Sequence, residues 1–159
     1  MVENIIVRPV TKKDLEGVYA LAQTSSHGLT TLSKDKKSLE KKIDKAVQSF
    51  SNHIGTPKDE LYLFVGEDAK TKKIIGTTAI LSVVGGKDPF YSLKRTAHYQ
   101  YSDFKEIEHQ CIEVQSKINP SSELCTLYIH PDYRKSGLGR ILSLVRFLYM
   151  AQYKRRFKS

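Results

Sequence analysis

A basic, glycine-containing segment lies between two apolar stretches of this sequence, and its residue types suit an anionic ligand. It reads Arg134-Lys135-Ser136-Gly137-Leu138-Gly139 and is followed by Arg140. Backbone N–H groups at the start of a helix bind phosphate well, and glycine lets a ligand approach them closely. The cationic side chains add positive charge and Ser136 adds a hydroxyl donor. The segment therefore predicts a loop that binds a pyrophosphate.

The spacing and the flanks of this loop narrow its interpretation. It lacks the Lys-Ser/Thr ending of a Walker A loop and the full G-x-G-x-x-G of a dinucleotide site. An apolar strand is predicted over 124–129 before it, and an apolar helix over 141–153 after it. An ordinary strand-to-helix turn with basic flanks is the alternative, but it leaves the agreement of glycines, charge and position unexplained.

The other elements follow from hydrophobic period and turn residues. A strand at 5–7 is followed by a helix around 15–22, for which Thr11 or Asp14 is the predicted cap. Ser33 is the predicted N-cap of a second helix, whose apolar stripe runs from Leu39 to Phe50. A hairpin is predicted from 61–66 and 74–84, and weaker strand patterns occupy 96–101 and 107–114. This mixture predicts an α/β or α+β fold with a mixed sheet.

Length and composition predict a single domain over 1–159. The chain of 159 residues is 40% hydrophobic and 27% charged, which is ordinary for a globular protein. Its mean hydropathy is −0.40, and no apolar run reaches the roughly 20 residues of a membrane helix. Residues 1–4 lack the features of a signal peptide, so we expect a cytoplasmic protein without a membrane partner. Residues 154–159 directly follow the last helix, which suggests a longer parent enzyme.

Cysteine and charge patterns exclude some functions. Cys111 and Cys125 have no metal-ligand spacing, so we expect reduced thiols and no bound metal. The 26 Lys and Arg residues against 17 Asp and Glu give a net charge of +9, which permits nucleic acid or a polyphosphate as a partner. The lysines between 34 and 45 are interrupted by acidic residues, as on a solvated helix face. A nucleic-acid-binding module is therefore the weaker hypothesis.

The strand, loop and helix around 124–153 resemble motif A of the GNAT acyltransferase superfamily, whose pattern is Arg/Gln-x-x-Gly-x-Gly/Ala. This resemblance implies a GNAT-like fold in which the pantetheine of an acyl-coenzyme A lies beside the fourth strand, here 124–129. Leu127, Tyr128 and Ile129 would contact it together with the loop and Arg140. A backbone N–H near Leu127 or Tyr128 would stabilise the oxyanion of the thioester.

A closer resemblance, to the arginine N-succinyltransferase family, covers nearly the whole chain. Its blocks are Ile6-Val7-Arg8-Pro9-Val10, Gly28-Leu29-Thr30-Thr31-Leu32, Asp88-Pro89-Phe90-Tyr91 and Ser121-Ser122-Glu123-Leu124-Cys125-Thr126-Leu127. The family transfers succinyl from succinyl-coenzyme A to the α-amine of arginine in arginine catabolism, and it contacts the donor at the position of Leu127. Its chains are longer, and the histidine regarded there as proton donor lies downstream of this sequence. The chain thus resembles the N-terminal part of that enzyme.

Transfer to an amine requires a base for the amine and an acid for the leaving thiolate. Glu123 is a candidate base and Tyr128 a candidate acid, although a solvated carboxylate and a packed tyrosine are the simpler interpretations. His27, Gly28, Leu29 and Thr30 are candidates for enclosing the amino acid.

Arg95 is a candidate for the succinyl carboxylate, with Lys94 and His98 as alternatives, because a guanidinium pairs well with that group. Cys125 is expected in the core, and His109 and His130 on the surface or in loops. An acetyltransferase acting on another small amine with acetyl-coenzyme A remains open, as does the assembly of the chain into a homo- or hetero-oligomer.

Overall fold

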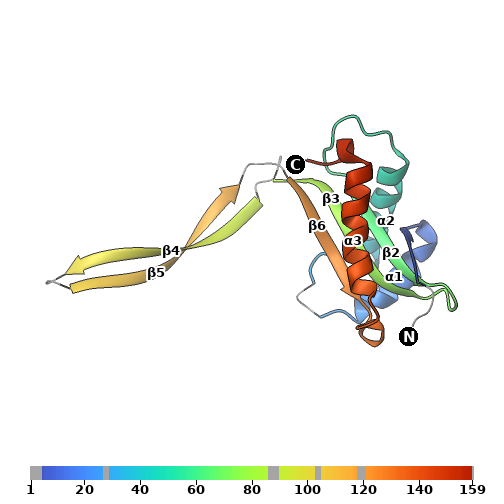
Figure 1. Ribbon diagram of the computed structural model, residues 1–159, viewed down its shortest axis with the longest axis horizontal. Coiled ribbons are helices and arrows are strands. Elements are labelled where there is room, and N and C mark those ends of the chain that lie inside the picture. The colour runs from blue at the N-terminus through green and yellow to red at the C-terminus, as the bar shows by residue number, and fades with distance from the viewer. Residues whose placement is uncertain (1–4, 27–28, 86–89, 103–104, 118–120, 159) are drawn as a thin grey trace. The chain divides into compact units, whose positions relative to one another are not determined.

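The chain forms two compact units. The computed structural model describes residues 5–26, 29–85, 90–102, 105–117 and 121–158 (Figure 1). The first unit comprises 1–83 and 121–159 and the second 84–120. We call the first unit the body and the second the arm.

The body contains a four-stranded sheet in the order β1-β2-β3-β6 (Figure 1). Its strands are β1 (Ile5–Pro9), β2 (Leu61–Asp68), β3 (Ile74–Val84) and β6 (Ser121–Ile129). Its helices are α1 (Leu15–Gln23), α2 (Lys36–Ser51) and α3 (Leu138–Gln152), with short 3-10 turns η1 (Lys12–Asp14), η2 (Pro131–Tyr133) and η3 (Lys154–Arg156). The β2–β3 hairpin predicted from the sequence is confirmed, and the pairs β1–β2 and β2–β3 are antiparallel.

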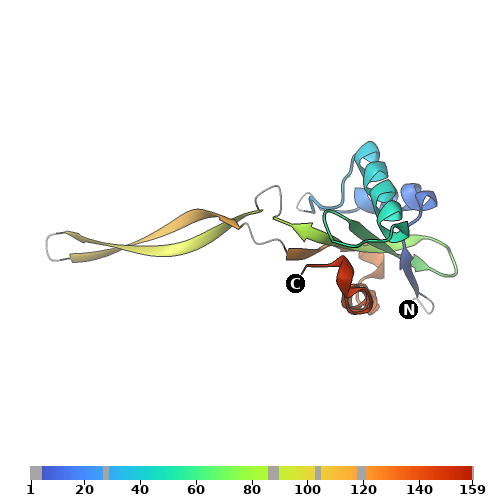
Figure 2. The ribbon, with the colours of Figure 1, turned by 90° about the horizontal axis from the view of Figure 1, so that it is seen from above.

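Helices cover both faces of this sheet, with α1 and α2 on one face and α3 on the other (Figure 2). Strand β2 is buried along its whole length, and its side chains alternate between two clusters. Leu63 and Val65 pack toward α1 and α2, whereas Tyr62 and Phe64 pack with Tyr149 of α3. A strand buried on both faces reads as a continuous apolar run, which is why 61–66 carries no alternation.

Two paired glycines let α3 approach the sheet closely. Gly66 and Gly76 lie opposite each other in β2 and β3. A Cβ at Gly76 would lie 2.8 Å from Cδ1 of Leu142, and one at Gly66 would lie 3.2 Å from Cδ1 of Leu138. Both leucines are fully buried. The missing side chains of the two glycines therefore make room for α3, whose first residue is at the predicted phosphate loop.

The start of α2 differs from the sequence prediction. Asp35, and not Ser33, is the N-cap, because its carboxylate accepts a hydrogen bond of 2.8 Å from the Ser38 N–H. The Ser33 hydroxyl instead accepts from the Asp35 N–H. Aspartate and serine are comparable caps, so the pattern alone did not distinguish them. Of the two alternative caps predicted for the first helix, Asp14 is the N-cap of α1 but makes no side-chain cap hydrogen bond there. Thr11 is the N-cap of η1, where it forms a capping box with Asp14.

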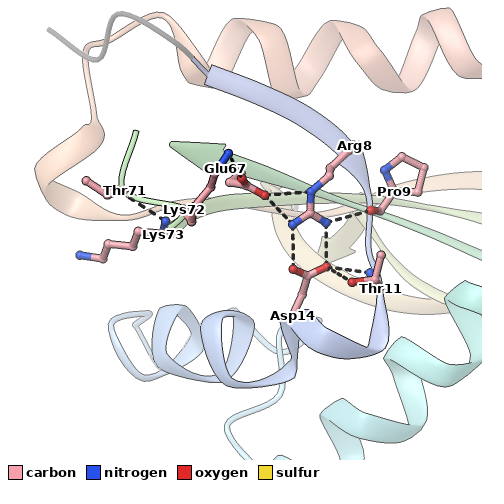
Figure 3. A network of polar contacts seen from close by, with 8 residues as sticks. All are labelled: Arg8, Pro9, Thr11, Asp14, Glu67, Thr71, Lys72 and Lys73. Atoms are coloured by element: carbon pink, nitrogen blue, oxygen red, sulfur yellow. Dashed lines mark hydrogen bonds and ion pairs between the residues drawn. The ribbon is translucent and has the colours of Figure 1, made fainter. Parts of the chain in front are cut away.

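An ion-pair network ties β1 to β2 and to η1 (Figure 3). Arg8 donates to both carboxylate oxygens of Asp14 at 2.8 Å and to Oε2 of Glu67 at 2.6 and 2.9 Å. Asp14 also accepts from the Thr11 N–H and hydroxyl. Burial opposes ionisation of Asp14, but the hydrogen bonds from Arg8 and Thr11 outweigh it and lower its pKa. Hydrogen bonding to Arg8 is also the main reason why the pKa of Glu67 is lowered.

The arm is an antiparallel ribbon of β4 (Phe90–Ser102) and β5 (Lys105–Lys117). The weak strand patterns at 96–101 and 107–114 lie within these strands, so both predicted strands exist but are longer than expected. The two strands pair with each other in a sheet of their own. Within the described residues, no helix is both long and apolar enough to cross a membrane.

Candidate functional site

A cavity of about 500 Å³ lies where β6 ends and α3 begins. Every residue that lines it was predicted from the sequence to bind the cofactor. The lining residues are Leu127, Tyr128, Ile129, Arg134, Lys135, Gly137, Gly139 and Arg140. The strand end and the basic loop, which the sequence places in succession, thus form one concave surface.

The loop conformation depends on Gly137, which is the N-cap of α3. Its φ of +85° is left-handed, a conformation that is costly for residues with a Cβ. The Gly137 carbonyl accepts from the N–H groups of Arg140 and Ile141 at 3.1 and 3.2 Å, which closes the first turn. The positive end of the helix dipole therefore lies at the cavity.

Two residues predicted to bind the cofactor, Ser136 and Leu138, do not line the cavity. The Ser136 hydroxyl donates to the Tyr133 carbonyl at 2.6 Å, so it shapes the turn. The Leu138 side chain is fully buried with Leu142 and Ile75 and anchors the helix start. Gly139 matters for packing as well, since a Cβ there would lie 3.1 Å from Cδ1 of Ile129.

The cavity is strongly cationic. Arg134, Lys135 and Arg140 are exposed. Among the described residues, none of the three has a carboxylate within ion-pair distance. The Arg134 guanidinium lies over the Tyr128 ring and donates to the Ile129 carbonyl at 3.4 Å, which holds it at the cavity wall. Three cations beside a helix N-terminus form an electrostatic site for a polyanion.

A backbone distortion in β6 was not visible in the sequence. Thr126 has a φ of +55°, which is unusual for a β-branched residue. Its carbonyl accepts from the Thr77 hydroxyl of β3 at 3.0 Å, which holds the distorted backbone. The inside-outside alternation breaks here, because Cys125 and Thr126 are both buried and Leu127 is exposed at the cavity. The residue types around Thr126 do not predict such a bend.

The loop after α1 lies beside this distorted stretch. The Tyr128 hydroxyl donates to the Thr24 carbonyl at 2.6 Å, and the Thr126 hydroxyl lies 3.5 Å from the Thr31 carbonyl. Of the predicted substrate residues, Leu29 packs against the core and Thr30 is exposed, whereas His27 and Gly28 lie outside the described residues. Thr24 and Thr31, on either side of the predicted acceptor residues, therefore lie beside Thr126 and Tyr128 of β6.

The predicted catalytic and acyl-binding residues are more scattered. Glu123 is half-buried near the start of β6, roughly 13 Å along the strand from Leu127, and does not line the cavity. Burial raises the pKa of the Cys125 thiol, which fits the core role predicted for it. Arg95 is exposed on β4 of the arm. The described residues contain no cluster of three metal-ligating side chains.

Arg146 of α3 is a charged residue that the sequence reasoning missed. It is only 7% exposed, and burial lowers its pKa. It donates to the Ser143 carbonyl at 3.3 Å and to the Ser143 hydroxyl at 2.9 Å. No described carboxylate lies within ion-pair distance of it. The sequence does contain a signal for this residue, because Arg146 is a charged residue within the apolar pattern of the predicted helix.

Comparisons with known proteins identify the family of the chain. Residues 5–159 match the family described as arginine N-succinyltransferase beta subunit. The arginine N-succinyltransferase of Enterobacter sp. (strain 638) is 36% identical over 96% of this chain and 45% of its own length. The chain thus spans about half the length of the curated relatives that it matches.

Solved structures show the same fold. Subunit AI of the arginine/ornithine succinyltransferase of Pseudomonas aeruginosa has a TM-score of 0.87 and 28% identity, over 97% of this chain and 47% of that one. The PaiA N-acetyltransferase of Thermoplasma acidophilum, solved in complex with coenzyme A, has a TM-score of 0.53 and 16% identity, over 96% of this chain and 76% of that one. The predicted GNAT-like fold is confirmed. Because the family match covers 5–159, the chain belongs to the arginine N-succinyltransferase beta subunit family.

Proposed function

We propose that the body binds succinyl-coenzyme A at the cavity between β6 and α3, and that the enzyme containing it transfers succinyl to the α-amine of arginine. The cationic cavity at the N-terminus of α3 carries this proposal. Arg134, Lys135 and Arg140 supply charge for the phosphates, and Gly137 and Gly139 leave room for them. The family membership supports both the donor and the acceptor.

In this proposal the pantetheine lies along the β6 edge, beside Leu127. The amine nitrogen attacks the thioester carbon directly, the C–S bond breaks, the nitrogen loses a proton and the thiolate gains one. A backbone N–H near Leu127 or Tyr128 stabilises the oxyanion as its charge develops. The distortion at Thr126 supports this placement, because it turns Leu127 toward the cavity.

The candidate acid and base stay predictions. The Tyr128 hydroxyl lies near the cavity, but it already donates to the Thr24 carbonyl, so it must exchange that bond to protonate a thiolate. Glu123 lies nearer the start of β6, away from the cavity, and would act on an amine positioned by the loop at 29–32. This arrangement also leaves room for residues outside this chain, in a longer enzyme, to contact the acceptor. We also propose a cytoplasmic location, where this catabolic reaction would take place.

Arg146 suggests how a succinyl group is distinguished from an acetyl group. It lies about two turns along α3 from the phosphate loop, and α3 packs beside β6, the strand that carries Leu127. A donor extending from the loop along β6 carries its acyl group toward this region. A buried guanidinium whose one side-chain partner among the described residues is Ser143 can pair with the terminal carboxylate of succinyl.

Calorimetric titration of the 159-residue chain with succinyl-coenzyme A, acetyl-coenzyme A and coenzyme A tests the proposal. We expect Arg134→Glu to weaken all three about ten-fold, since it reverses one phosphate contact. Lys41→Glu, an equal charge change at an exposed position on α2, is the matched control and should leave them unchanged. Folded protein that binds none of the three ligands would refute the site, as would equal behaviour of the two variants.

The donor preference is tested in the same titrations with Arg146→Met. We expect a loss of about ten-fold in affinity for succinyl-coenzyme A alone, the size of one charged hydrogen-bonded contact. Acetyl-coenzyme A and free coenzyme A serve as internal controls, because they lack the carboxylate. An equal loss for all three ligands would instead indicate a structural role for Arg146.

A further inference from the structure

The arm has one apolar face and one polar face. Side chains alternate along each strand, and residues directly opposite in the two strands share a face. We call the first of these the apolar arm face. It contains Tyr91, Leu93, Arg95, Ala97, Tyr99 and Tyr101 of β4 with their partners Ser116, Val114, Ile112, Gln110, Glu108 and Glu106 of β5. The large apolar side chains on this face are between 56% and 77% exposed.

The opposite face is polar and places groups of opposite charge beside one another. Lys94 lies directly across from Glu113, and Nε2 of His98 lies 3.1 Å from Oε1 of Glu113. Ile107, which lies opposite Gln100, is a large apolar residue on this face and is 45% exposed. The polar face is therefore the side that faces water.

The apolar arm face requires a partner. A two-stranded ribbon alone is at best marginally stable in water, and each strand here has 13 residues. A contiguous exposed apolar face of this kind marks an interaction surface. The helices that cover the body sheet have no counterpart within the arm, whose described residues form only the two strands.

The charges on this face indicate which partner fits. Its described residues include one cation, Arg95, in the half nearest Tyr91, and two carboxylates, Glu106 and Glu108, in the half nearest the β4–β5 turn. Two arms packed face to face in parallel would place the carboxylates against each other, which is destabilising. Two arms packed antiparallel place the Arg95 half of each against the carboxylate half of the other.

We propose that two copies of this chain associate through their apolar arm faces, antiparallel and around a two-fold axis. In this arrangement Leu93, Ile112 and Val114 of each copy pack near Tyr99 and Tyr101 of the other. The contact is isologous, which means that the same face of each copy forms both sides of it. The pairing of the Arg95 half with the carboxylate half therefore occurs twice in the dimer. The polar faces remain outside.

Sedimentation velocity over a concentration series tests this arrangement with complementary charge variants of the whole chain. We expect the wild type to dimerise. Arg95→Glu makes every charge on the face negative, and the double variant Glu106→Arg, Glu108→Arg makes every charge positive. Each variant alone should be monomeric. An equimolar mixture should dimerise again, because each arm then meets opposite charge.

Gln100→Glu is the matched control, since it adds charge to the polar face and should leave the dimer intact. Three results would overturn the proposal: a wild type that stays monomeric at all concentrations, a dimer that survives Arg95→Glu, or folded variants whose mixture stays monomeric. If another part of the same chain or another protein covers the apolar arm face, the wild type stays monomeric.

This proposal stands apart from the proposed function, because particle size does not depend on ligand binding. It gives Arg95 a role different from the succinyl contact predicted from the sequence. Titrating monomeric Arg95→Glu with succinyl- and acetyl-coenzyme A separates the two roles. If Arg95 acts only between arms, the donor preference of this variant matches that of the wild type.

Discussion

Strands β2 and β4 are both rich in apolar and aromatic residues, yet only β2 is buried. Strand β2 pairs with β1 and β3, and helices cover it on both faces. Strand β4 pairs with β5 alone, and its tyrosines and Leu93 are exposed. Burial is thus decided by the layers that surround a strand rather than by its own composition. In the body, the chain's own helices cover the sheet. The apolar arm face has no such cover within the arm, so it needs a second layer from outside the arm.

This comparison predicts that structural damage is severe in the body and slight in the arm. The largest effect is expected for Arg8→Met, which leaves buried Asp14 without its cation and buried Glu67 with only the weaker pair to Lys72 at 3.4 Å among the described residues. Breaking such a pair costs about 3 kcal/mol of unfolding free energy, at the lower end of the usual range because Arg8 is partly exposed. Urea denaturation measures it. A loss below about 1 kcal/mol would show that the network contributes only as a surface ion pair.

The same network predicts a pH dependence. The folded-state pKa values of Asp14 and Glu67 are lowered, mainly through Arg8, so the stability from their ionisation is present above the unfolded pKa values near 4. It is lost as the pH falls below about 4. Because Arg8→Met removes this lowering, its deficit relative to the wild type should shrink between pH 6 and pH 3. A constant deficit would exclude the carboxylates as its cause.

The second effect concerns the contact between α3 and the sheet. In Gly76→Ala the new Cβ lies 2.8 Å from Leu142 and 3.1 Å from the Tyr128 carbonyl, so we expect a loss of about 1–3 kcal/mol. Gly55→Ala is the matched control, because a Cβ there meets nothing within 4 Å. It should be neutral or slightly stabilising. Equal unfolding midpoints for the two variants would show that α3 adjusts freely.

The body and the loop were largely predictable because their signals are local. The hairpin at 61–84, the strand before the loop and the apolar helix after it each depend on neighbouring residues. The loop residues that line the cavity follow directly from the glycine and arginine spacing. Even the error at Ser33 displaced the start of α2 by a short distance only.

The remaining features depend on contacts that are distant in sequence. The Arg8–Glu67 pair joins two strands, and the left-handed Thr126 is held by Thr77 of β3. Neither contact has a local pattern. The arm was read as two weak strands because its face pattern is interrupted by Arg95 and Ala97, and only the register with β5 shows which residues share a face. Arg146 lies within the helix predicted over 141–153, and its burial depends on packing that the helix pattern does not show.

The smallest effect on the body is expected from the arm. In Leu93→Ser an apolar side chain that is 71% exposed is replaced, so the unfolding free energy of the body should change by less than about 0.5 kcal/mol. Segment-resolved hydrogen exchange tests this directly. Amides of β4 and β5 should exchange faster in the variant than in the wild type, whereas β2 and β3 should be unchanged, since the two units bury separate residues. Faster exchange in β2 would show that the arm and the body unfold together. In that case β2 and β4 differ in how exposed their side chains are, but the two units are not independently stable.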